Sequence, residues 1–96
     1  MQINSEDIAV IHNKAEKRFQ IRIDNHLAEL LYQLSDGTIT FIHTSVPSAL
    51  EGQGIGSKLA KAGLDFAQVN SLKVRSLCWF VDRYIQRHPE YQSLLR

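Results

Sequence analysis

The chain has 96 residues, 44% of them hydrophobic and 22% charged, which is the size and composition of one small globular domain spanning residues 1–96. Eleven Lys and Arg residues stand against ten Asp and Glu, so the formal net charge is only +1. That balance disfavours a dedicated binder of nucleic acid or of a membrane surface. The charge is uneven, because residues 71–96 hold five basic and two acidic groups. A nucleic-acid binder that uses this basic third is therefore a remaining, weaker alternative.

Cys78 is the only cysteine, which excludes an internal disulfide and a multi-cysteine zinc site. Three of the four histidines, His12, His26 and His88, show no metal-ligand spacing, so we expect no metal. The N-terminus has no basic start and no apolar core, and no stretch approaches the roughly 18 apolar residues that span a bilayer. We expect a cytoplasmic protein. So short a chain buries a small core, and a ligand or a second copy in a homodimer would add stability.

The first half of the chain predicts strands. Phe19, Ile21 and Ile23 alternate with polar residues, the period of a half-buried strand. Asp36 and Gly37 favour positive φ and hence a tight hairpin. The predicted strands are 8–12, 19–23, 27–34 and 38–44, which together make an antiparallel meander.

Helical periodicity begins after Pro47, which cannot donate to a β-ladder. Pro89 ends the last helical pattern, because a proline disfavours the helical conformation of the residue before it. The predicted elements of this half are a helix over 55–69, a strand over 73–79, a second helix over 80–87 and a short docked tail over 88–96.

Three glycines, Gly52, Gly54 and Gly56, lie at every second position between the last strand of the meander and the first helix. Glycine allows a close backbone approach, and a helix N-terminus offers unpaired N–H donors with a positive dipole end. This arrangement predicts a cradle for a pyrophosphate, to which Ser57 adds a hydroxyl and Lys58 a charge. The alternative is a glycine-rich connector without a ligand.

Two other phosphate loops are excluded by the same residues. The loop of nucleotide triphosphatases ends in Gly-Lys-Ser or Gly-Lys-Thr, whereas this one ends in Gly56-Ser57-Lys58. The dinucleotide fingerprint belongs to the first unit of a parallel fold, whereas this loop follows apparently antiparallel strands.

The chain resembles the GNAT superfamily of acetyl-coenzyme A dependent N-acetyltransferases, whose loop reads Gln/Arg-x-x-Gly-x-Gly/Ala. More closely, it is similar to a short stand-alone branch of about 90 to 100 residues. The segments that carry the resemblance are His43-Thr44-Ser45-Val46-Pro47, the glycine loop, Leu77-Cys78-Trp79-Phe80-Val81 and Arg87-His88-Pro89-Glu90-Tyr91. The resemblance implies an α/β (α+β) fold: a mixed, mostly antiparallel sheet of about five strands with two main helices, opened into a V between the fourth and fifth strands.

The resemblance also implies a site. The pantetheine arm of acetyl-coenzyme A would lie in the V, and the thioester would point toward Cys78, a candidate acetyl-accepting nucleophile with His43 as a nearby base. The residues expected to contact the cofactor are Val46, Gly52, Gln53, Gly54, Ile55, Gly56, Ser57, Lys58, Phe80 and Tyr84.

Each of these residues also has a structural interpretation. A lone cysteine in such a place is most often an inert buried hydrophobe. His43 follows Ile39 and Phe41 at period two, so its ring would face the sheet interior. The aromatic residues Trp79, Phe80, Tyr84 and Tyr91 favour a place in the core. Arg83 and Arg87 lie four apart and would either meet the adenosine phosphate or form a solvated basic face.

Two departures from the family pattern bear on function. Glu51 stands where the motif has Gln or Arg, and its carboxylate would repel a pyrophosphate. The helices that usually wall the acceptor site, between the first two strands, are absent. We expect an enzyme that transfers acetyl from acetyl-coenzyme A to an amine, of a small molecule or a protein, directly or through Cys78. The alternative is a non-catalytic module that holds coenzyme A or docks on a protein.

Overall fold

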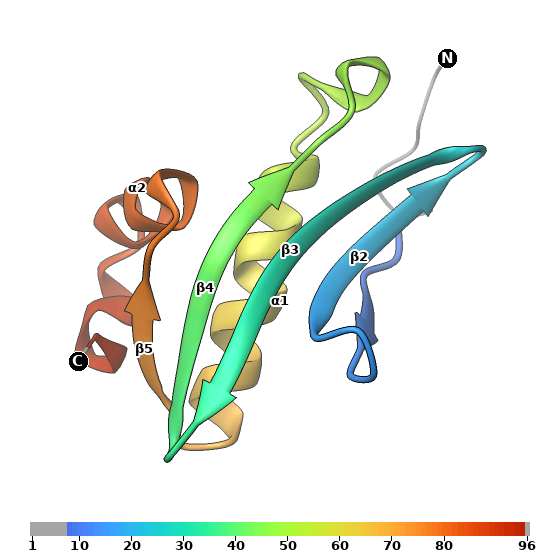
Figure 1. Ribbon diagram of the computed structural model, residues 1–96. Coiled ribbons are helices and arrows are strands. Elements are labelled where there is room, and N and C mark those ends of the chain that lie inside the picture. Colours follow the sequence, from blue (N-terminus) through green and yellow to red (C-terminus); the bar gives the residue numbers. More distant parts are fainter. Residues whose placement is uncertain (1–7, 96) are drawn as a thin grey trace.

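The structure is a computed structural model that describes residues 8–95. Figure 1 shows a curved sheet with helices packed against it. The elements in chain order are β1 (Ile11–Asn13), β2 (Arg18–Ile23), β3 (His26–Ser35), β4 (Thr38–Ser45), the 3₁₀ turn η2 (Ser48–Leu50), α1 (Ile55–Val69), β5 (Lys73–Ser76), α2 (Trp79–Arg87) and the 3₁₀ segment η3 (Pro89–Leu94). Within this part of the chain, no helix has the length and apolar character that a membrane crossing requires.

The five strands form one sheet in the order β1-β2-β3-β4-β5. The first four pair antiparallel, and β5 joins the edge parallel to β4. The predicted class, a mixed and mostly antiparallel sheet with two main helices, is confirmed. The predicted helix over 55–69 has the bounds of α1. Between β1 and β2 the described chain makes only a turn, so no helix stands there.

Two strand predictions were too long. The first strand covers Ile11–Asn13 rather than 8–12, and the fifth ends at Ser76 rather than at 79. The last bond between the two segments runs from the Leu77 N–H to the carbonyl of Phe41 (2.8 Å). The Ser76 hydroxyl then accepts from the Cys78 N–H (3.3 Å) and donates to the Cys78 carbonyl (3.0 Å), which turns the chain into α2.

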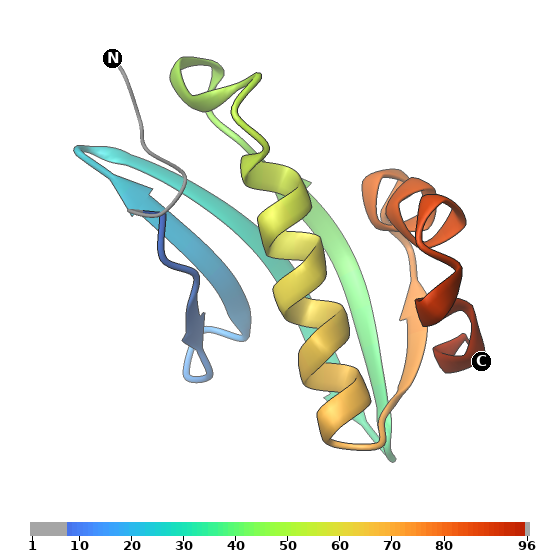
Figure 2. The ribbon, with the colours of Figure 1, turned by 180° about the vertical axis from the view of Figure 1, so that it is seen from behind.

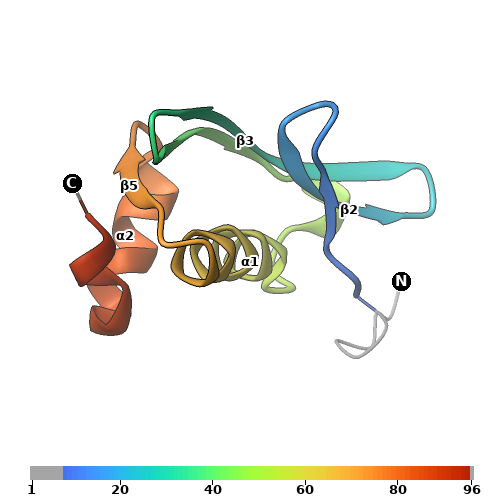
Figure 3. The same ribbon diagram turned by 90° about the horizontal axis from the view of Figure 1, so that it is seen from below.

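Helix α1 lies against one face of the sheet, and Figure 3 shows that no helix of the described chain covers the other. The contact is close: a Cβ at Gly63 would stand 2.7 Å from Phe41 Cε1, so only glycine fits there. The uncovered face carries an ion pair between Arg18 and Glu29 (3.1 Å). The side chains most completely buried between the layers are Ile21, Leu30, Ile39, Phe41, Leu50, Ile55, Leu59, Leu64, Val74, Val81 and Ile85.

The tail docks as predicted. Figure 2 shows the C-terminal segment beside β5, on the face of the sheet that α1 covers. Tyr91 of η3 is buried, and its hydroxyl donates to Asp65 of α1 (2.6 Å). Lys61 pairs with the same carboxylate (2.6 Å). Val74 and Leu95 form a further parallel β-bridge. These contacts fix the tail against α1 and β5.

Candidate functional site: a groove between two helix N-termini

Strands β4 and β5 separate halfway along β4. Their pairing runs from Thr38 and Lys73 to Phe41 and Ser76 and then stops. Beyond it β4 continues to Ser45, while the other chain turns into α2, and Figure 1 shows the two diverging. The site lies in this opening, where η2, α1 and α2 meet.

A β-bulge decides which β4 side chains face the helices. Phe41 pairs with Tyr32, but the next residue of β3, Leu31, pairs with His43, so Ile42 is an extra residue in β4. Paired residues share a sheet face. Thr44 pairs with the fully buried Leu30 and therefore lies on the α1 face, whereas His43 lies on the uncovered face and is exposed. The period-two expectation that His43 faces the interior is thus wrong.

Cys78 is the residue immediately before α2, and it is 5% exposed. Its Sγ lies 3.3 Å from the hydroxyl oxygen of Thr44. Its carbonyl accepts from the Asp82 N–H (3.0 Å), the first turn of α2. The structure thus brings Cys78 to Thr44 and not to His43. Strict alternation of the side chains along β4 did not predict that Thr44 faces the site.

The glycine loop presents backbone donors. Gly52 (φ 79°) and Gly54 (φ 74°) have left-handed backbones that only glycine adopts freely, and Gly54 caps α1 without help from any side chain. The first helical bond runs from the Lys58 N–H to the Gly54 carbonyl (3.1 Å). The N–H groups of residues 55–57 precede this bond and stand at the positive end of the helix dipole, where they can receive an anion.

Gly56 does not have a positive φ, so its role is not to allow a left-handed backbone but to leave space for a neighbouring side chain. A Cβ there would stand 2.7 Å from Cζ of Phe80 on α2. The missing side chain lets the Phe80 ring lie directly on the first turn of α1. The two helix N-termini are thereby held together.

Two adjoining hollows, here called the groove, follow this contact and share Ser57 and Phe80. The loop half has a volume of about 240 Å³ and is lined by Val46, Leu50, Glu51, Gly52, Gly54, Ile55, Gly56, Ser57 and Phe80. The α2 half has a volume of about 310 Å³ and is lined by Ser57, Trp79, Phe80, Arg83, Tyr84, Arg87 and His88.

Most residues expected at the cofactor therefore line one half or the other. Gln53 and Lys58 line neither, and Lys58 instead borders a separate hollow with Lys61 and Asp65. The sequence interpretation did not single out Leu50, Trp79 or His88 as lining residues. Among residues 8–95, no group of three His, Cys, Asp or Glu side chains is placed to hold a metal.

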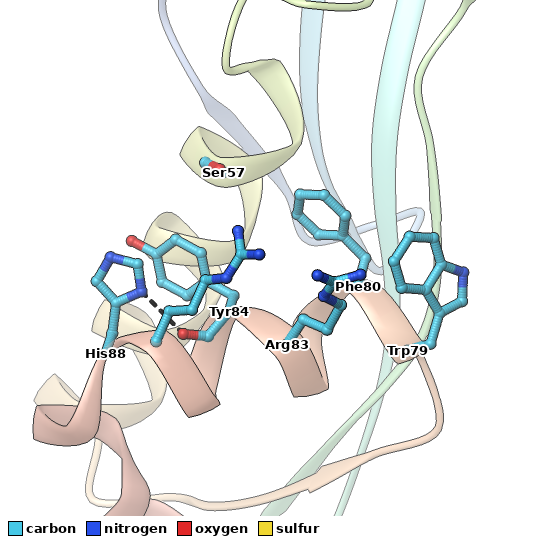
Figure 4. A pocket seen from close by; sticks show the side chains of 7 residues that line it. Ser57, Trp79, Phe80, Arg83, Tyr84 and His88 are labelled. Atoms are coloured by element: carbon cyan, nitrogen blue, oxygen red, sulfur yellow. Dashed lines mark hydrogen bonds between the residues drawn. The ribbon is translucent and has the colours of Figure 1, made fainter.

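One face of α2 builds the second half of the groove. Phe80, Arg83, Tyr84 and Arg87 recur at helical spacing, and Figure 4 shows the first three of them rising toward the turn of α1 that carries Ser57. The ring of His88 stacks on Tyr84 at 3.9 Å and contacts the Tyr84 carbonyl through Nδ1 (2.8 Å). Burial raises the pKa of Tyr84, so its hydroxyl stays protonated at neutral pH.

Trp79 contradicts the expected aromatic core. Its side chain is 69% exposed at the edge of the groove, where it meets Phe80 edge to face at 5.9 Å. Tyr91 is buried as expected. The difference arises because β5 ends early: Trp79 becomes the first residue of α2, on its outer side, instead of the last residue of a strand.

Comparison with known proteins adds sequence and structural relatives. Residues 18–94 match the family model described as GCN5-related N-acetyl-transferase. Protein NATD1 of Xenopus tropicalis is 36% identical over 95 residues, covering 96% of this chain and 87% of its own. Protein NATD1 of Homo sapiens is 37% identical over 92 residues, covering 93% and 81%.

The solution structure of a GCN5-like protein from Staphylococcus aureus superposes with a TM-score of 0.72 at 34% identity, covering 92% of this chain and 87% of its own. The family match spans most of the described residues, including the glycine loop, Thr44, Cys78 and the groove-lining face of α2. The chain therefore belongs to the GCN5-related N-acetyltransferase family.

Proposed function

We propose that the chain binds acetyl-coenzyme A in the groove and transfers the acetyl group to an amine. The observation that carries the proposal is that the two halves of the groove adjoin at Ser57 and Phe80. Together the two halves extend from Val46, which follows β4, past the N-terminus of α1, which has no side-chain cap, to the basic face of α2. An elongated ligand with a thioester at one end and phosphates further along matches that order of polar groups.

Each part of the groove has a task under this proposal. The N–H groups of residues 55–57 hold the pyrophosphate, and the hydroxyl of Ser57 adds a donor. The backbone of Val46 orients the pantetheine amides beside the open edge of β4. Thr44 and Cys78 line neither half of the groove; they lie where β4 and β5 part, close to Val46 and Trp79 in the chain, and under this proposal the thioester reaches toward them.

Transfer has two routes. In the direct route the amine nitrogen forms a bond to the acetyl carbonyl carbon, the carbon–sulfur bond breaks, and coenzyme A leaves as a thiol with the proton that the amine loses. In the covalent route Sγ of Cys78 forms the first bond and releases coenzyme A as a thiol, which takes up the thiol proton of Cys78. The amine nitrogen then forms a bond to the acetyl carbonyl carbon, the bond from that carbon to Sγ breaks, and the proton that the amine loses returns to the Cys78 thiol. The Thr44 hydroxyl, 3.3 Å from Sγ, orients the sulfur in this second route.

A non-catalytic module that holds coenzyme A is the second candidate. Its supporting observation is the turn that joins β1 to β2, because in the described chain no helix stands there to wall an acceptor site. Turnover of acetyl-coenzyme A with a panel of amines separates the two functions.

The first test is a thermal-unfolding titration with acetyl-coenzyme A, followed by intact mass to detect an added acetyl group. A ligand at 100 times its Kd adds about 2.7 kcal/mol, which raises the midpoint of so small a domain by roughly 10 to 20 °C. ATP is expected to give no comparable rise. An acetyl group on Cys78 supports the covalent route, and no shift at millimolar acetyl-coenzyme A overturns the proposal.

A matched pair of variants locates the site. Gly54 and Gly37 both have positive φ and both have open space where a Cβ would stand, so Ala strains either backbone in the same way. Gly54→Ala is expected to weaken acetyl-coenzyme A binding, because it displaces the donors at the start of α1. Gly37→Ala, in the β3–β4 turn, is expected to lower stability by a similar amount and leave binding unchanged.

A further inference from the structure

The face of the sheet opposite α1 carries an excess of basic side chains. Paired residues share a sheet face, so the strand register assigns each residue to one side. Arg75 pairs with Thr40, and its neighbour Val74 is buried on the α1 side, so Arg75 and Lys73 belong to the uncovered face. The charged strand residues of this face are the basic Arg18, Arg22, Lys73 and Arg75 and the acidic Glu29. Figure 3 shows this face on the side of the sheet away from α1.

Most of this positive charge is not neutralised. Glu29 is already paired with Arg18 (3.1 Å). The carboxylates of Asp24 and Asp36 lie in the turns at the strand ends and pair with none of the other cations. These cations are exposed and take part in no ion pair of the described chain: Arg22, Lys73 and Arg75. Exposed charges of one sign attract a partner of the opposite sign over roughly 8 to 10 Å, so the face suits an anionic partner.

The other side chains of the face favour a polypeptide over a nucleic acid. An open sheet that binds single strands uses aromatic side chains as platforms for the bases. The phenylalanine and tyrosine residues of the five strands, Phe19, Tyr32 and Phe41, are all buried on the α1 side, which leaves His43 as the one ring on the uncovered face of these strands. Between its charges the uncovered face has aliphatic and amide side chains: Ile11, Gln20, Leu27, Leu31 and Gln33.

The opening between β4 and β5 connects this face with the site. The β4–β5 pairing ends at Ser76, and Arg75 is the residue before it. His43 and Thr44 are neighbours on β4 with opposite orientations. His43 therefore borders the opening on the uncovered side, while Thr44 lies with Cys78 on the other. A side chain that enters the opening from the uncovered face approaches Cys78 from beside His43 and Arg75.

We infer that the uncovered face of the sheet docks an acidic segment of the acceptor protein, so that the amine acetylated is a lysine flanked by Asp and Glu. The inference rests on the proposed function and adds the chemical class of the acceptor. Under that proposal acetyl-coenzyme A occupies the groove on the helix side, and no residue of the uncovered face lines either half of it. The lysine ε-amine takes the part of the amine in either route above, with the same bonds formed and broken.

The docking step is tested without cofactor. The probe is a fluorescent peptide with a blocked N-terminus and one lysine flanked by glutamates, and its anisotropy is followed at low and high salt. Lys73→Gln/Arg75→Gln is expected to weaken binding about three- to tenfold at low salt, the size of effect that exposed charges give. The matched control, Lys14→Gln/Lys17→Gln, removes the same charge from the exposed β1–β2 turn and is expected to bind the peptide as the wild type does.

Acetyl transfer tests the acceptor class. Intact mass follows transfer to the glutamate peptide and to a second peptide in which every glutamate is replaced by glutamine. At low salt and low peptide concentration, the wild type is expected to acetylate the glutamate peptide about three- to tenfold faster. Lys73→Gln/Arg75→Gln is expected to lose this preference and to keep the wild-type rate on the glutamine peptide, which shows that its cofactor site is intact.

Equal transfer to the two peptides by the wild type overturns the inference and leaves the proposed function standing. Peptide binding that Lys73→Gln/Arg75→Gln does not weaken also overturns it. Binding of single-stranded DNA in place of the acidic peptide assigns the face to nucleic acid and overturns it as well. Failure to bind acetyl-coenzyme A, or to acetylate any amine, overturns the proposed function together with this inference.

Discussion

The hydroxyl of Thr44 and the thiol of Cys78 lie 3.3 Å apart, although 34 positions separate the residues in the chain. The contact joins the end of β4 to the start of α2 across the opening between β4 and β5. It exists because the bulge at Ile42 turns Thr44 toward the helices and His43 away from them. Any chemistry at Cys78 therefore takes place beside a threonine hydroxyl.

Thr44→Val is expected to reduce acetylation of Cys78 about fivefold, because it removes a contact of roughly 1 kcal/mol that orients the sulfur. Thr44→Ser keeps the hydroxyl and is expected to retain most of the activity. The measurement is the rate of acetyl incorporation followed by intact mass, with Cys78→Ala as the blank. A wild-type rate in Thr44→Val together with loss of transfer in His43→Gln would assign the role to His43 instead.

Glu51 borders the loop half of the groove with an exposed carboxylate. Replacing it by arginine exchanges repulsion of the pyrophosphate for attraction, so Glu51→Arg is expected to bind acetyl-coenzyme A about three- to tenfold more tightly at low salt. Calorimetric titration at two ionic strengths measures the effect. Glu16→Arg, an equal charge change in the exposed β1–β2 turn, is the control, and equal tightening there would show that only the overall charge matters.

Gly56 and Gly63 are two positions where α1 packs closely against other elements. A Cβ would stand 2.7 Å from a ring carbon of Phe80 at the first position and of Phe41 at the second. Either alanine variant is expected to cost about 1–3 kcal/mol of stability by overpacking. Only Gly56→Ala also weakens acetyl-coenzyme A binding, because Phe80 lines the groove.

Urea unfolding and ligand titration of both variants separate these effects. Phe80→Leu is expected to restore part of the stability of Gly56→Ala, since it removes the ring that the new Cβ meets. If Gly63→Ala impairs binding as much as Gly56→Ala does, the groove responds to α1 as a whole and not to the Phe80 contact.

His12 stacks on Phe19 at 4.2 Å and hydrogen-bonds the Tyr32 hydroxyl, which ties β1 to the sheet. Burial, and next the charge of Lys14, hold the pKa of His12 below its ordinary value of 6.5. The unfolded chain therefore takes up the proton first. The stabilisation is fully present above pH 6.5 and declines as the pH falls through this range toward the lower pKa of the folded state.

His12→Phe keeps the stacking but cannot titrate, so it is expected to lose this part of the pH dependence. Urea unfolding at a series of pH values between about 8 and 5 measures it. Identical pH profiles for His12→Phe and the wild type would show that His12 is not a source of the decline.

Local features of the sequence determined much of this protein. Helix α1 could be predicted to the residue, because its apolar period extends over 15 residues and Gly54 begins it. The turn at Asp36 and Gly37 and the four antiparallel strands followed from turn chemistry and alternation. The glycine loop could be identified because positive φ and a missing Cβ are properties of the residue itself.

Only the tertiary structure decided which residues meet at the site. Alternation along β4 predicted that His43 faces the interior. The bulge in β4, which depends on pairing with β3, instead turns Thr44 to the interior and His43 to the uncovered face. The end of β5 depends on the last bond to Phe41, and it made Trp79 an exposed groove residue. A strand's faces and ends depend on its partner strands, and a local pattern does not contain that information.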